Sequence, residues 1–167
     1  MLENQKVLVK NMTNHKVGFT CVNFPNFYEF NGGQVLPVKW EHLEDAAYST
    51  GVRYMFENAM LRIEPTTENY SEVMENLQLS HLAEQIDNSL GYTEAKKLLS
   101  VTPLAANYAK IKNHLEMGTA TTKENIAKAA LELKIKDYMV NTWVKKATNI
   151  DVIKALELNE AAPEIKE

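Results

Sequence analysis

Side chains that could do chemistry are few and scattered in this sequence. No two of its four histidines are spaced like metal ligands, and no cysteine or carboxylate completes a set with them; they are His15, His42, His81 and His114. The one cysteine, Cys21, lies in the apolar run FTCVNF without an adjacent histidine or basic residue. This setting favours a buried thiol over a reactive one. The sequence therefore predicts no metal site and no cysteine nucleophile.

Acidic pairs and glycine turns give no stronger signal. Glu44 and Asp45 are adjacent, whereas the carboxylates of glycosidases flank a substrate from different elements. His42 lies among acidic residues in a helical pattern and is expected on an exposed face. The turn at Asn31–Gly33 lacks the later glycine and lysine of a phosphate-binding loop. We therefore predict no catalytic residues, no cofactor and no enzymatic activity; an enzyme whose site is assembled from distant residues remains an alternative.

Residues 121–158 (TTKENIAKAALELKIKDYMVNTWVKKATNIDVIKALEL) have the outline of a DNA-binding helix-turn-helix followed by a third helix. Three helices this short must pack their apolar stripes together to be stable. The stripe residues are Ile126, Ala130 and Leu133, then Met139, Val140, Trp143, Val144 and Ala147, then Val152, Ala155 and Leu156. Acidic residues lie among the lysines, and the segment has no arginine, the commonest reader of guanine. A plain three-helix core is favoured, and a helix-turn-helix regulator using residues 122–147 is the alternative.

The overall charge also bears on the class of partner. The chain has 167 residues, a formal net charge of −4 and a pI of about 5.6. Nucleic-acid binders usually carry a basic surplus because phosphate contacts dominate their affinity, so nucleic acid is not an expected partner. The sequence contains no apolar run long enough for a membrane span and no signal-peptide pattern at its start. A single cysteine suits folding in a reducing cytoplasm.

The composition changes near residue 65 and predicts an α+β fold. Residues 1–64 form a small β-rich module with a short helix over 40–49, because short aromatic and β-branched runs alternate there with turn signals. Residues 65–69 are the expected linker, residues 70–160 an all-α helical module, and residues 161–167 a frayed tail. The predicted strands are 6–10, 16–22, 26–30, 34–38 and 60–63, and the predicted helices of the second module are 70–77, 79–88, 93–100, 104–116, 122–134, 138–147 and 151–158.

Aromatic residues are dense in the first module. Most are expected in its core, since a module this small needs large side chains to bury enough area. Large side chains that stay exposed near turns are instead typical anchors of a protein interface. Four residues near predicted turns are therefore candidate docking anchors, with a core position as the alternative for each: Phe24, Phe27, Tyr28 and Tyr54.

Two stretches resemble a group of small virion proteins of tailed bacteriophages. In the first, VLVKNMTNHKVGF is followed by NGGQVLPVKWEHLEDAAYSTGVRYMFENAMLRIE: a strand ends in an Asn-x-Thr-Asn turn, then come Val-Gly-Phe, a glycine turn and a short acidic helix. The second, IAKAALELKIKDYMVNTWVKKATNIDVIKALEL, has a helix, an Asp-containing turn and a closing helix with Asp-Val-x-Lys-Ala. Together the quoted residues, 7–19, 31–64 and 126–158, cover about half of the chain. Residues 65–120 and the segment Cys21–Phe30 depart from the pattern.

This resemblance implies a non-enzymatic structural component of a tailed-phage virion, assembled in the host cytoplasm and docked onto capsid or neck. The implied partners are other virion proteins, such as capsid, portal or neck proteins, or further copies of the chain. The resemblance carries over no catalytic, cofactor-binding or metal-binding residue. A two-module chain without evident chemistry is suited to presenting surfaces, and in a particle of many copies modest interfaces add up.

Overall fold

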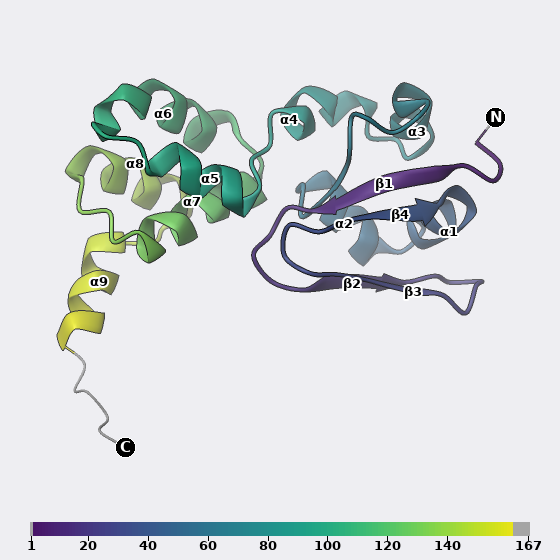
Figure 1. Cartoon of the computed structure of the whole chain (residues 1–167), viewed down its shortest axis with the longest axis horizontal. Helices are drawn as coiled ribbons and strands as arrows, with labels where there is room; N and C mark the ends of the chain where they lie inside the picture. The colour runs from purple at the N-terminus through teal and green to yellow at the C-terminus, as the bar shows by residue number, and fades with distance from the viewer. Residues whose placement is uncertain (1, 162–167) are drawn as a thin grey trace, which may run out of the picture.

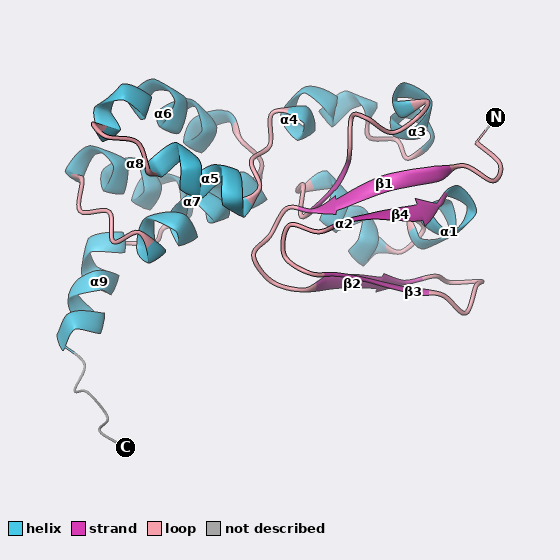
Figure 2. Ribbon diagram, in the orientation of Figure 1, coloured by secondary structure: helices cyan, strands magenta, loops and turns pink. Residues whose placement is uncertain are grey.

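The computed structural model describes residues 2–161 and has the mixed α+β fold that the sequence predicts. Figure 1 shows two bodies side by side, one with all the strands and the first helices, the other with the remaining helices. In Figure 2 the strands are confined to the N-terminal body. No helix within residues 2–161 is long and apolar enough to cross a bilayer.

Two small antiparallel sheets form the N-terminal part. Their strands are β1 (Lys6–Asn11), β2 (Val17–Thr20), β3 (Phe27–Phe30), β4 (Val35–Lys39) and β5 (Leu61–Ile63). β1 lies between β4 and β5, while β2 and β3 form a separate hairpin. Val7 and Val9 alternate with less buried residues along β1, so one face of this strand packs on the core. β4 is an edge strand, which suits Pro37 because it has no N–H to donate. All five predicted strands are confirmed to within a few residues.

Short helices complete the first core. They are α1 (Trp40–Ala46), α2 (Thr50–Glu57), α3 (Tyr70–Asn76), the 3₁₀ helix η1 (Ser80–Leu82) and α4 (Ala83–Asp87). Val73 and Met74 of α3 and Ile86 of α4 are buried in the same cluster as the strand residues. The first core therefore extends well past the predicted module boundary.

The expected linker, residues 65–69, packs against the sheet. Thr67 is buried, and its Oγ1 accepts a hydrogen bond from the amide of Leu8 in β1 at 3.2 Å. The change from one core to the other falls later, between Ile86 and Ala95. Polar residues around Pro65 indicate a turn, but the local sequence does not reveal that a threonine hydroxyl binds this turn to a strand far away in the sequence.

Six helical segments build the second core: α5 (Tyr92–Leu99), the 3₁₀ helix η2 (Leu104–Asn107), α6 (Tyr108–Met117), α7 (Ala120–Glu132), α8 (Tyr138–Thr148) and α9 (Val152–Ala161). Asp137 caps α8 by accepting a hydrogen bond from the amide of Val140 at 3.0 Å. Most of the predicted stripe is buried: Ile126, Ala130, Val140, Val144, Val152 and Leu156. Met139 is an exception, with 44% of its surface exposed. Of the expected tail, Ala161 ends α9, and residues 162–167 lie outside the described residues.

Candidate functional site

The two modules are joined by the buried side chain of Asn125 on α7. This residue is 1% exposed, and its Nδ2 donates to the carbonyls of Met12 at 2.8 Å and Leu90 at 2.9 Å. The amide of Tyr92 also donates to the Met12 carbonyl at 3.1 Å, and the amide of Leu90 donates to Thr122 Oγ1 at 3.0 Å. Because Met12 directly follows β1, these bonds hold the end of the central strand against α5 and α7.

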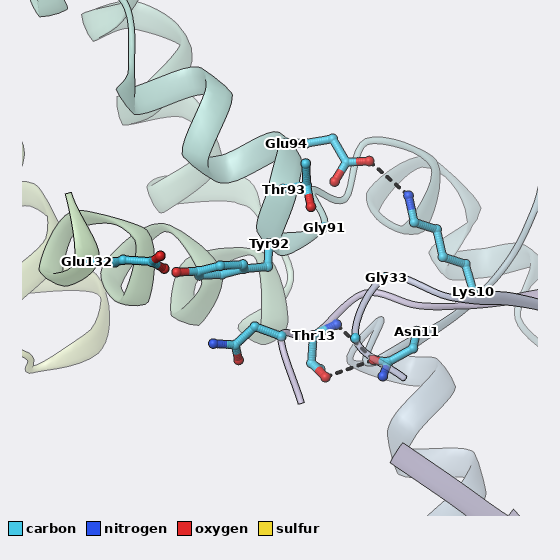
Figure 3. A pocket seen from close by; sticks show the side chains of 11 residues that line it. Lys10, Asn11, Thr13, Gly33, Gly91, Tyr92, Thr93, Glu94 and Glu132 are labelled. Atoms are coloured by element: carbon cyan, nitrogen blue, oxygen red, sulfur yellow. Dashed lines mark hydrogen bonds and ion pairs between the residues drawn. The ribbon is translucent and has the colours of Figure 1, made fainter. Parts of the chain in front are cut away.

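An open hollow of about 520 Å³ lies beside this junction (Figure 3). Its walls come from the end of β1, the turn at Gly32–Gly33, the start of α5 and Glu132 at the end of α7. Figure 3 shows Lys10 and Glu94 pointing toward each other, and the ring of Tyr92 extending toward Glu132. The Nζ of Lys10 lies 2.9 Å from Glu94 Oε1.

The charged side chains that line the hollow are already paired. Besides the Lys10–Glu94 pair, Glu132 Oε1 lies 3.0 Å from Lys96 Nζ. Burial works to raise the pKa of Glu94, but the hydrogen bond from Lys10 and the charges of Lys10 and Arg62 outweigh it, so this pKa lies below its ordinary value. The hollow therefore has the chemistry of a structural joint.

The turn that follows β1 is built around the buried side chain of Asn11. Its Nδ2 faces the carbonyls of His15, Phe30 and Asn31 at 2.6, 3.2 and 3.1 Å. Its Oδ1 accepts hydrogen bonds from the amide and the hydroxyl of Thr13 at 2.9 and 2.8 Å. One side chain thus ties β1 to the turn that precedes β2 and to the end of β3. The Asn-x-Thr pattern has a structural role here.

His42 is buried, and the expectation that it lies on an exposed helical face is wrong. It is 5% exposed, its Nδ1 lies 2.6 Å from the hydroxyl of Tyr28, and its ring centroid lies 4.8 Å from that of Phe24. The reason is tertiary, because the β2–β3 hairpin folds over α1 and covers the imidazole. Local polarity around residue 42 could not show this contact.

Asp45, one turn further along α1, binds the loop between β2 and β3. Its carboxylate accepts hydrogen bonds from the amides of Asn23 and Val22 at 3.0 and 2.5 Å and from Asn23 Nδ2 at 2.5 Å. The hydrogen bonds from Asn23, which have the largest effect, and the bond from Val22 hold the pKa of Asp45 below its ordinary value.

Burial and the nearby Asp45 charge raise the pKa of the half-buried Cys21 thiol. The raised pKa keeps this thiol protonated at neutral pH. The sequence context predicts a buried thiol, whereas the structure leaves Cys21 only half-buried.

The four predicted docking anchors divide into two pairs. Phe24 and Tyr28 are half-buried and pack the hairpin onto α1, so they belong to the interior of the module. Phe27 and Tyr54 are 61% and 58% exposed. Phe27 lies on the outer face of β3 against Gly18, where an added Cβ would meet the phenyl ring at 3.0 Å. Phe27 is therefore a large apolar side chain presented to solvent on the outer face of the hairpin.

Other exposed apolar residues have no distinguishing signal in the sequence. Val22 lies in the loop between β2 and β3, Tyr48 follows α1, and Tyr138 begins α8. Each lies in a pattern that would equally suit a core residue, and only the packing of the neighbouring elements leaves it in solvent.

The helical module differs from the first module in charge. Residues 2–90 carry 6 lysines and arginines against 12 acidic residues, whereas residues 91–161 carry 11 lysines against 8 acidic residues. The acidic surplus of the whole chain therefore lies mainly in residues 2–90, which supply the first core. The average charge of the chain is thus a poor guide to the surface of the helical module.

The outer side of α8 is flanked by two grooves. One, of about 540 Å³, lies between α6, α7 and α8, and the other, of about 560 Å³, lies between α8 and α9. Both are lined by Thr142 and Lys146. The second also contains Lys145, whose Nζ lies 3.0 Å from Asp151 Oδ2. α8 is therefore a ridge that a partner could contact from either side.

Comparison with known proteins adds no assignment to these surfaces. Within residues 2–161, no group of three or more His, Cys, Asp or Glu side chains is placed to hold a metal ion. No protein-family model matches the sequence, and neither a curated protein nor a solved structure shows significant similarity to it.

Proposed function

We propose that the chain is a non-enzymatic structural component of a tailed-phage virion that docks onto the capsid or the neck. The observation that carries this proposal is the presentation of Phe27 on the outer face of the hairpin, 61% exposed and held against Gly18. Exposed aromatic side chains on rigid supports are typical interface anchors. The likeness of residues 7–19, 31–64 and 126–158 to small virion proteins supports the same proposal, although Phe27 itself lies in a segment that departs from that pattern.

The hairpin has the features of a pre-organised docking element. Asn11 fixes one end of it, and Asp45 fixes the loop at the other end. Binding therefore needs little further ordering of the hairpin, which lowers its entropic cost. Burying the exposed part of Phe27 would contribute roughly 1–2 kcal/mol. Among the described strands, β2 and β3 pair only with each other, so a partner strand could also add to the hairpin.

A DNA-binding regulator is the second candidate. The lysine surplus of residues 91–161 and the exposed Thr142 and Lys146 on α8 favour it. Against it, residues 91–161 contain no arginine, and Lys145 is already paired with Asp151. Both features weaken base reading and phosphate binding.

Quantitative mass spectrometry of purified particles tests the proposal. We expect the chain in the particle at a copy number that fits a fivefold, sixfold or twelvefold site. Phe27→Ser should reduce incorporation about tenfold, since it removes the anchor. Tyr48→Ser, a change at another exposed aromatic residue, is the matched control and should be incorporated normally. Absence of the chain from particles, together with salt-sensitive binding to duplex DNA, would replace the virion role with the regulator.

A further inference from the structure

The last turn of α9 is an exposed surface that is both apolar and acidic. Leu158 is 63% exposed, and Glu157 and Glu160, its near neighbours in the sequence, are exposed as well. Leu156 is buried and packs the first half of the helix on the second core. In Figure 1 the helix then runs away from the body of the module, on the side opposite α6. Leu158 is therefore a large apolar side chain left in solvent at the end of a projecting helix.

The groove between α6, α7 and α8 has the complementary chemistry. Leu115, Trp143 and Ala147 supply its apolar part, and its rim carries Lys112, Lys123 and Lys146. Its one acidic residue, Glu116, lies 3.8 Å from Lys112, which leaves the other two lysines without an ion pair to the described residues. The groove is thus apolar inside and positively charged at its edge.

We propose that the end of α9 of one copy of the chain docks into this groove of a second copy. Leu158 would enter beside Trp143, and Glu157 and Glu160 would face the lysines of the rim. An amphipathic helix laid in an apolar groove is a recurrent mode of recognition. Glu160 already faces Lys136 at 3.2 Å, but both side chains are largely exposed, so this pair is weak and can exchange partners.

We take a second copy as the occupant because α9 lies away from the groove of its own chain. α9 points away from α6, which forms one wall of that groove (Figure 1). The acidic end of α9 also matches the rim lysines in sign. Such a contact joins two different surfaces, so repeated copies close into a ring or continue as a chain. The contact does not depend on the proposed virion role.

Sedimentation velocity of the full chain tests this contact. We expect association at about 0.1 M salt that weakens at about 1 M salt, because the screening length falls from ~10 Å to ~3 Å. Leu158→Ser should weaken association about tenfold, as expected for loss of an apolar anchor. Met117→Ser, at another exposed apolar residue of the helical module, should associate like the wild type.

A charge exchange separates this contact from other modes of association. Lys123→Glu with Lys146→Glu, and separately Glu157→Lys with Glu160→Lys, should each leave the chain monomeric, while an equal mixture of the two variants should associate again. Lys97→Glu with Lys110→Glu makes the same charge change away from the groove and should associate normally. Circular dichroism verifies that each variant is folded. A monomeric wild type, association that ignores these changes, or a mixture that stays monomeric would each overturn the proposal.

Discussion

Truncation of Asn125 to alanine should loosen the joint between the two cores. The change removes two hydrogen bonds, to Met12 and Leu90, from a site that is 1% exposed. The Met12 carbonyl still accepts a hydrogen bond from the amide of Tyr92 at 3.1 Å, so the Leu90 carbonyl is the acceptor that the change affects most. Loss of a hydrogen bond costs about 0.5–1.5 kcal/mol, and a buried polar group left without a partner costs about 1–3 kcal/mol. We therefore expect Asn125→Ala to lower the free energy of unfolding by about 2–3 kcal/mol.

The two tryptophans allow the cores to be followed separately. Trp40 is buried in the first core, and Trp143 packs against the second. In the Trp40→Phe background fluorescence reports on the second core, and in the Trp143→Phe background it reports on the first. Adding Asn125→Ala to each background should move the two urea unfolding midpoints further apart, because the joint couples the cores.

The matched control is Asn113→Ala on α6, the same change at an exposed asparagine. Its free energy of unfolding should stay within about 0.5 kcal/mol of the wild type. An equally small effect of Asn125→Ala would refute the assignment of this side chain as the joint.

Three further outcomes follow from local geometry and charge. Gly118→Ala would place a Cβ 2.3 Å from the His114 carbonyl oxygen and should lower stability by about 1–3 kcal/mol in urea unfolding. At Gly51 an added Cβ would meet only Ser49 Oγ, at an ordinary contact distance of 3.8 Å, so Gly51→Ala should be neutral or stabilising. The pKa of Glu94 in the folded chain lies below its unfolded value of about 4.3, so the carboxylate stabilises the fold fully above that value and loses this effect as pH falls through the folded pKa. Glu94→Gln should therefore make the melting temperature depend less steeply on pH below about 4.5. An unchanged slope would contradict this prediction. Iodoacetamide should alkylate Cys21 at neutral pH more slowly in the folded chain than in the urea-unfolded chain, and equal rates would contradict the raised thiol pKa.

Local sequence was sufficient for most of the secondary structure. The strands and helices follow from side-chain periodicity, and the cap at Asp137 and the edge position of Pro37 follow from the hydrogen-bonding capacity of single residues. These features depend on neighbours within one turn or one strand. They could therefore be predicted before any long-range contact was known.

The roles of individual side chains were decided by contacts between distant parts of the chain. Asn125 binds the carbonyl of a residue 113 positions earlier, and nothing around it in the sequence marks it as the joint. His42 is buried because a hairpin folds over it, and the same fold buries part of Tyr28 while leaving Phe27 exposed. Sequence periodicity gives the face of an element on which a side chain lies. Only the tertiary structure determines whether that face meets another part of the chain or the solvent.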